Sequence, residues 1–306
     1  MTERIVLPTT DGHQLVADLH LPEGSPKGLA LLGHAMMVDR RTMDRPKGRG
    51  LASVLVERGL AVLNVDFRGH GESVLHTGLS FSFDDIVRND VPALVFALRD
   101  RFPDLPRFLV GHSLGVNAGL PGLALLRDHG VRAVVAIAPN LWAPKFEPSL
   151  VRRLKKRAMV TAFELAARPT GFFDPAPFGM GRSRIPRPYV EQFGKFYRDD
   201  RLVSLDGADD YEQGLASLAL PILAWSGGND TLMAHPDAVA QYLRLFSRAT
   251  VDHRRFVGEV DAHALARRVN RSSRDHRVGA GEIHVFEQAD ALTALAERHQ
   301  RVDGDG

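Results

Sequence analysis

The sequence predicts an α/β fold in which a mostly parallel central sheet is flanked by helices. Short apolar runs alternate with helix-like patterns from residue 29 to residue 138, which is the order of βαβ units. A serine between two glycines, in Gly111-His-Ser-Leu-Gly115, joins an apolar run to a helix-like segment. Residues 139–218 lack strand periodicity and are too many for a plain loop, so they predict a helical insertion.

The first elements follow from hydrophobic periodicity. Residues 3–7 and 14–21 read as two strands of a hairpin, because the second alternates apolar and polar side chains. Residues 29–33 form a short, wholly apolar run that predicts a buried strand. An amphipathic helix over 51–58 and a second buried strand over 60–66 follow. Strand, helix and strand in this order predict a parallel pair with a crossover.

The same alternation continues to residue 138 and resumes after residue 218. The expected elements are a helix over 83–101, a strand over 108–110 with a helix after it, a strand over 133–138, a strand over 221–226, a helix over 236–246 and a strand over 249–257. Pro121-Gly122 falls in the helix after residue 113 and is expected to kink or shorten it. The rest of the chain after residue 257 is rich in arginine and gives no clear pattern.

The break in the pattern predicts the domain organisation. We expect residues 1–139 and 219–306 to form the core, and residues 140–218 to form a helical cap inserted after the sixth strand. A basic amphipathic stretch over 150–168 is the main helix expected there, and its Lys/Arg run at 152–157 is expected to be a solvated face.

Composition excludes several classes of function. The 306 residues are 44% hydrophobic and 25% charged, with a formal net charge of +2, so nothing indicates nucleic-acid binding. The chain has no cysteine, which excludes a thiol nucleophile and thiolate metal ligands. No motif indicates a metal, a nucleotide or a flavin, so no cofactor is expected. The N-terminal residues lack a signal-peptide pattern and no apolar run reaches about 20 residues, which favours a cytoplasmic protein without a membrane span.

Ser113 is the candidate nucleophile. At a tight turn between a strand and a helix, side chains two positions before and after the serine would collide, so glycine is required at 111 and 115. Such a turn holds the serine in a strained backbone with its hydroxyl above the sheet. A serine hydroxyl still needs a histidine to accept its proton and a carboxylate to orient that histidine.

A second segment, Asp66-Phe-Arg-Gly-His-Gly-Glu-Ser73, strengthens one resemblance. Together with the Gly-His-Ser-Leu-Gly turn, it resembles the α/β-hydrolase superfamily, and in particular its serine esterases and lipases. The resemblance implies that this segment is structural, with an arginine that pairs with a carboxylate. It therefore implies no chemistry for Arg68 or His70. His112, in the serine turn, is also expected to pack or to hydrogen-bond locally.

The resemblance also implies the chain order nucleophile, acid, histidine. Asp230 ends the strand after the insertion in Ser226-Gly-Gly-Asn-Asp230, so it is the candidate acid. The candidate base is His263, which lies 33 residues after Asp230 and follows the last predicted strand. His284 is the alternative, because residues 282–286 could themselves be that strand. His253 would point along a strand rather than out of a loop.

The negative oxygen of a tetrahedral intermediate needs two N–H donors. The backbone N–H of Leu114, directly after the nucleophile, is expected to be one of them. The other is expected from the loop after residue 33, which reads Gly33-His-Ala-Met-Met37. By position Ala35 is the candidate and Met36 its alternative. Met36 and Met37 are also candidates for the apolar lining of an acyl pocket.

The sequence therefore predicts a serine hydrolase that cleaves a carboxylic ester, a thioester or a lactone through an acyl-serine intermediate. The expected substrate is a small molecule with a hydrophobic or acyl portion. Two alternatives stay open: an acyltransferase with the same triad, and a catalytically weakened member that serves as a binding protein. The second alternative is supported by the lack of a single clear histidine candidate, by Gly33-His34 where relatives often have His-Gly, and by Val116 where they often have a smaller residue. The intact serine turn and the position of Asp230 argue against it.

Overall fold

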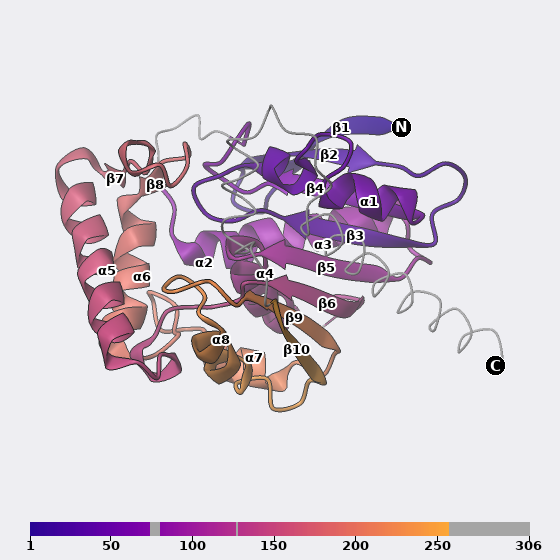
Figure 1. Ribbon diagram of the computed structural model, residues 1–306. Coiled ribbons are helices and arrows are strands. Elements are labelled where there is room, and N and C mark those ends of the chain that lie inside the picture. Colours follow the sequence, from indigo (N-terminus) through magenta and orange to yellow (C-terminus); the bar gives the residue numbers. More distant parts are fainter. Residues whose placement is uncertain (74–79, 127, 257–306) are drawn as a thin grey trace.

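The structure is a computed structural model that describes residues 1–73, 80–126 and 128–256. In these ranges an eight-stranded sheet has the order β1-β2-β4-β3-β5-β6-β9-β10 (Figure 1). Its strands are β1 (Thr2–Pro8), β2 (Gln14–His20), β3 (Gly28–Gly33), β4 (Leu60–Asp66), β5 (Arg107–His112), β6 (Val131–Ile137), β9 (Ile222–Gly227) and β10 (Val251–Phe256). Only β2 pairs antiparallel, with β1 and β4, within this described sheet. The predicted fold class is confirmed.

The apolar runs form strands because the sheet is covered on both faces. All residues of β3 and β4 are buried, as in parallel strands between two layers of helices. Alternate residues of β3 enter different cores. Leu29 and Leu31 pack with α3 (Val91–Arg101) and α4 (Leu114–Leu125), whereas Ala30 and Leu32 pack with α1 (Leu51–Glu57).

The helix predicted over 83–101 contains a change of hydrogen-bond pattern. α2 (Phe83–Asp85) begins at Ser82, whose side chain caps it, and a π-helical turn over Ile86–Asp90 leads into α3. Pro92 is in the first turn of α3. A proline has no N–H for the carbonyl four residues earlier, and this favours the wider turn.

α4 is not shortened at Pro121, which was one of the two expected outcomes; the other, a kink, stays a prediction. The helix continues through the proline to Leu125. Gly122 faces the helix before β5, where a Cβ would lie 2.6 Å from Cγ1 of Val91. The pair of residues that looked like a helix breaker therefore allows close packing of two helices. Farther along, α8 (Pro236–Leu243) ends three residues before the predicted end at 246.

The residues between β6 and β9, here called the inserted segment, are mainly helical. They contain α5 (Leu150–Thr170), α6 (Arg187–Asp199) and α7 (Tyr211–Ser217), and α5 and α6 lie side by side beyond one end of the sheet (Figure 1). Ser149 caps the start of α5, and Gly171 ends it in a left-handed conformation. A two-residue ladder of β7 (Phe172–Phe173) and β8 (Ile185–Pro186) was not predicted, because strands this short show no periodicity.

The Lys/Arg run of α5 differs from the expected solvated face at one position. Lys155 and Arg157 are exposed, but Lys156 is buried. Its ammonium lies 3.0 Å from Oε2 of the buried Glu147 and 5.1 Å from the ring centre of Trp142. A buried cation requires such partners. The partners come from residues before the helix, which periodicity alone could not identify.

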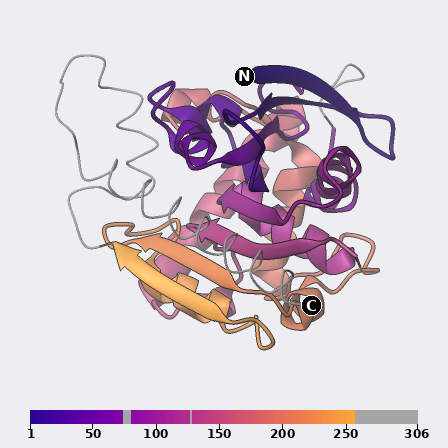
Figure 2. The same cartoon turned by 90° about the vertical axis from the view of Figure 1, so that its right-hand side faces the viewer.

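The sheet has β1 and β10 at its two edges, and Figure 2 shows β10 at one of them. Short 3-10 turns occur at Arg40–Asp44, Pro144–Phe146 and Ala176–Phe178. Within the described ranges, none of the helices is both long and apolar enough to cross a bilayer.

A buried carboxylate fastens the inserted segment to the core. Asp84 of α2 accepts hydrogen bonds from the Gln192 amide, from the Tyr211 hydroxyl at 2.5 Å and from the backbone N–H of Leu205 at 2.8 Å. All three donors belong to the inserted segment. Because a buried carboxylate without partners is costly, this cluster fixes α6 and α7 against α2.

We expect Tyr211→Phe to lower the free energy of unfolding by about 1.5–3 kcal/mol, the value of a hydrogen bond to a charged group. The matched control is Tyr242→Phe, because the buried Tyr242 hydroxyl has no hydrogen-bond partner among the described residues. Urea unfolding of both variants measures the difference. Equal effects would contradict the anchoring role of Tyr211.

Candidate active site

Ser113 lies alone between β5 and α4, with φ 48° and ψ −107°. A non-glycine residue with positive φ is strained and needs support from its surroundings. Its N–H donates to the carbonyl of Ile137 at 2.9 Å, and its carbonyl accepts from Asn117 N at 2.8 Å. The backbone around Ser113 is thus held by β6 on one side and by α4 on the other.

Glycine is required at 111 and 115 because neighbouring backbone atoms lie too close for a side chain. A Cβ on Gly111 would lie 2.4 Å from the nitrogen of Val116, and a Cβ on Gly115 would lie 2.3 Å from the carbonyl oxygen of Gly33. The second value shows that Gly115 also allows the end of β3 to approach α4. Gly115 N donates to the His34 carbonyl at 2.9 Å, which joins the serine turn to the loop after β3.

The loop after β3, residues 34–38 and here called the β3 loop, is built on two buried histidines. The His34 ring donates from Nδ1 to the Ala35 carbonyl at 2.7 Å and accepts from the N–H of Phe67 at 3.2 Å. The His70 ring contacts the Arg68 carbonyl through Nδ1 and accepts from the N–H of Met37 at 3.4 Å. Each ring therefore uses one donor and one acceptor nitrogen, which is the pattern of neutral imidazole.

Burial has a direct electrostatic effect on these rings, whose centres lie 5.0 Å apart. Loss of solvation lowers the pKa of His34 to about 4. The same cause, with repulsion from His34, lowers the pKa of His70 to about 3. Both rings are structural in the described arrangement, as the sequence indicated for His70.

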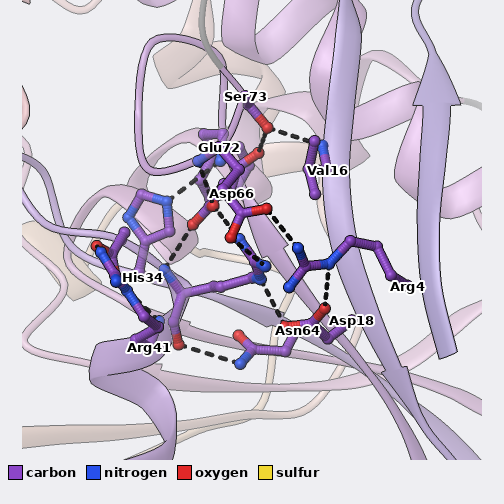
Figure 3. Close-up of polar contacts among 12 residues, drawn as sticks. Arg4, Val16, Asp18, His34, Arg41, Asn64, Asp66, Glu72 and Ser73 are labelled. Atoms are coloured by element: carbon purple, nitrogen blue, oxygen red, sulfur yellow. Dashed lines mark hydrogen bonds and ion pairs between the residues drawn. The ribbon is translucent and has the colours of Figure 1, made fainter. Parts of the chain in front are cut away.

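The Asp66–Ser73 segment is also structural (Figure 3). The buried carboxylate of Asp66 accepts from Arg40 N at 2.7 Å, from Glu72 N at 2.8 Å and from the Arg40 guanidinium. Ser73 Oγ donates to the Asp66 carbonyl at 2.6 Å. Arg68 pairs with the carboxylates of Asp90 and Asp11, as expected for an arginine that pairs with a carboxylate.

Asp230 lies in the turn after β9 and is buried. Its carboxylate accepts from the N–H groups of Leu232, Met233 and Ala234 at 3.0, 2.8 and 2.9 Å. These bonds fix the carboxylate, and they are also the bonds of an aspartate that caps a turn. β9 is parallel to β6, and β6 to β5, so Asp230 follows a strand end at the same edge of the sheet as Ser113.

Three residues that the sequence analysis did not single out connect this turn to the serine turn. Asn140 Nδ2 and Trp142 Nε1 both donate to the Met233 carbonyl, at 2.9 and 3.0 Å. Asn140 N donates to Oδ1 of Asn117, in the first turns of α4, at 3.0 Å. No motif marks these residues in the sequence, because their roles depend on segments that are far apart along the chain.

Of the three histidines considered as the base, only His253 belongs to the described residues. His263 and His284 lie outside the described residues. His253 lies within β10 rather than in a loop, as expected from the sequence. Its Nε2 is 2.8 Å from Oγ of Ser226. The structure thus brings the serine turn, with Leu114, next to the β3 loop. It places Asp230 after the end of β9, at the edge of the sheet where Ser113 follows β5.

A small apolar pocket lies where the β3 loop meets the inserted segment. Its walls come from the β3 loop, α5, α6 and the β7–β8 ladder, and all its lining side chains are apolar or aromatic. They are Met36, Met37, Val160, Phe163, Phe173, Ile185, Tyr189, Val190 and Phe193. A larger groove between α5 and α6 is lined mainly by charged side chains and contains none of the candidate residues. Within the described ranges, no group of three His, Asp or Glu side chains could hold a metal ion.

Comparisons with known proteins concern the family and the fold. Residues 47–171 match the family model described as serine aminopeptidase, S33. The chain is 26% identical over 273 residues to a monoglyceride lipase from Mus musculus, covering 85% of this chain and 83% of the relative.

Solved structures share the fold. The DcsB complex with its substrate analogue has a TM-score of 0.67 and 15% identity, over 97% of this chain and 99% of that one. An esterase from Pyrococcus furiosus has a TM-score of 0.61 and 18% identity, over 97% and 90%. At such identities the likeness concerns the fold alone.

The buried histidine pair predicts acid sensitivity. Each ring is neutral in the folded protein down to a pH near its lowered pKa, whereas an unfolded histidine has a pKa of about 6.5. The unfolded chain therefore binds more protons between these values, and the free energy of unfolding falls as the pH falls below about 6.5. Around pH 5, the free energy of unfolding of wild type should therefore change more steeply with pH than that of His70→Gln. We expect the two slopes to differ by about 1.4 kcal/mol per pH unit.

The measurement is urea unfolding of wild type and His70→Gln at several pH values from 4 to 7. Carboxylates contribute equally to both proteins, so the difference in slope isolates the histidine. Parallel pH profiles would contradict this prediction.

Proposed function

Since this chain belongs to the α/β-hydrolase superfamily, we propose that it is a serine hydrolase that cleaves carboxylic esters through an acyl-serine intermediate. The observation that carries the proposal is the conformation of Ser113, a non-glycine residue with φ 48° at a strand-to-helix turn. Such strain persists where the surrounding structure enforces it, and it is typical of functional sites. The likeness to monoglyceride lipase supports ester bonds as the target.

In the proposed reaction, Ser113 Oγ attacks the ester carbonyl carbon while a histidine accepts its proton. The tetrahedral intermediate collapses, the alcohol leaves with the proton of the histidine, and water then releases the acid from the acyl-serine by the same steps. Asp230 would orient the histidine and stabilise its charged form. His263 is the proposed base and His284 its alternative.

Leu114 and the β3 loop are the proposed donors to the negative oxygen. The N–H of Leu114 belongs to the first turn of α4, where N–H groups have no acceptor within the helix. Its position directly after Ser113 suits an oxygen bound to the attacked carbon.

The directions of two peptide groups in the β3 loop favour Met36 over Ala35 as the second donor. The C=O and N–H of a trans peptide point in opposite directions. Because the His34 carbonyl points to Gly115 N in α4, the N–H of Ala35 points away from that helix. The Ala35 carbonyl points to the His34 ring, so the N–H of Met36 points away from that ring.

We further propose that the inserted segment is a cap, and that the acyl chain enters between it and the β3 loop by widening the apolar pocket there. In the structure this pocket is closed to about 10 Å³, the space of about one water molecule. The pocket is lined by Met36 and Met37 of the β3 loop as well as by α5 and α6. Its lining offers no charge to an acid or amine, so the proposed substrate class is lipophilic esters of small alcohols.

Active-site labelling tests the triad. Fluorophosphonate treatment is expected to give one covalent adduct by intact mass in wild type and none in Ser113→Ala, because the hydroxyl is the nucleophile. Only one of the two variants His263→Ala and His284→Ala should be labelled much more slowly than wild type. We expect its labelling rate to fall by about 100-fold or more. A folded wild type that is not labelled would overturn the proposed function and favour a binding role.

Acyl-chain preference tests the pocket. For p-nitrophenyl esters, kcat/KM is expected to rise with chain length, since each buried CH2 contributes up to about 0.8 kcal/mol. Val190→Phe, which adds volume to the pocket lining, should shift the preference to shorter chains. Val151→Phe, on the exposed face of α5, is the matched control. The same chain-length profile in all three proteins would contradict this assignment of the pocket.

A further inference from the structure

Met37 in the β3 loop has a left-handed backbone, with φ 70°. A methionine rarely adopts this conformation, because its Cβ approaches the backbone too closely. Its side chain is buried and lines the apolar pocket. Such a conformation needs hydrogen bonds or packing that hold it.

The support comes from two directions. From the core, the ring of His70 accepts from the N–H of Met37 at 3.4 Å. From the inserted segment, the N–H groups of Arg182 and Ser183 both donate to the Met37 carbonyl, at 2.9 and 3.1 Å. The stronger support is thus given by residues more than 140 positions later in the chain.

Gly181 is the residue that allows this contact. A Cβ on Gly181 would lie 2.0 Å from the Met37 carbonyl oxygen, far inside van der Waals contact. Gly179 provides a contrast in the same loop. It also has a positive φ, but a Cβ there would meet nothing within 4 Å. Two features therefore require glycine at 181: the close approach to Met37 and a φ of 148°, which strains any side chain. At 179 only the positive φ, 66°, favours glycine.

We propose that Gly181 and the N–H groups of Arg182 and Ser183 are positioning elements for the oxyanion site. They fix the peptide between Met37 and Val38, and with it the left-handed conformation of Met37. The preceding part of the loop, which carries the N–H of Met36 that is the proposed donor, is connected to Met37 and takes its position from that conformation. This inference rests on the proposed function. It means that the donor geometry depends on the contact between the inserted segment and the β3 loop, so any displacement of that segment from the loop lowers the rate of chemistry as well as altering the pocket.

The test compares Gly181→Ala with Gly179→Ala, two substitutions in one loop of which only the first crowds Met37. Because alanine is also more strained at φ 148° than at φ 66°, the Ser183 variants described below, which leave residue 181 unchanged, complete the comparison. We expect kcat to fall about 10- to 100-fold in Gly181→Ala, below the 10²–10³ of a donor removed outright. KM should change less than twofold. Gly179→Ala should keep the kcat of wild type.

Inhibitor binding separates positioning from general damage. A trifluoromethyl ketone forms a charged adduct with serine, so its affinity should fall in parallel with kcat in Gly181→Ala. An ether analogue of the ester, which forms no adduct, should bind all three proteins equally. Loss of both affinities together, or equal kcat values in the two alanine variants, would overturn the inference.

A second variant covers the case in which Gly181→Ala does not fold. Ser183→Pro removes one N–H donor to Met37 without a new atom at 181, and Ser183→Ala keeps that donor. The proline variant should lose kcat and ketone affinity relative to the alanine variant, and equal values in the two would overturn the inference. Wild type that is not labelled at Ser113 would instead overturn the proposed function.

Discussion

The site depends on backbone segments that approach one another more closely than side chains allow. β3, β5 and α4 meet at Gly33, Gly111 and Gly115, where any Cβ would overlap a neighbouring main-chain atom. This contact sets the angle at which the chain leaves β5, and with it the left-handed conformation of Ser113. It also carries the hydrogen bond from Gly115 N to the His34 carbonyl, which fixes the start of the β3 loop. This one contact thus positions the nucleophile, the N–H of Leu114 after it, and the start of the β3 loop.

Buried polar groups surround this contact, and their pairing determines how strongly a substitution there destabilises the fold. Asp66, Arg68 and Asp90 are all buried and all paired, and the His34 and His70 rings are neutral with both nitrogens engaged. Removing one partner from such a set leaves another unsatisfied, which is more costly than the bond itself. The loops at this edge of the sheet are therefore specified by hydrogen bonds, whereas the strands are specified by apolar packing.

The inserted segment has two kinds of contact with the core. Asp84 fastens it through Gln192, Tyr211 and Leu205, on the side of α6 and α7. Residues 181–183 meet the β3 loop on another side. The first contact holds the segment to the protein, and the second connects it to the β3 loop that carries the proposed donor. Separate substitutions can therefore affect stability and chemistry independently.

The sheet strands, the serine turn and the helical character of the insertion could be predicted from the sequence, because each is encoded by residues that are neighbours along the chain. Hydrophobic periodicity marks β4 from residue 60 to 66 in prediction and structure alike, and Gly111 and Gly115 mark the turn through a local steric requirement. The surroundings of Met37, the burial of Lys156 and the bonds from Asn140 and Trp142 to Met233 could not be predicted and follow from the folded arrangement of the chain. These features join segments far apart in the sequence, and a single polar side chain carries no signal of the distant partner that folding brings to it.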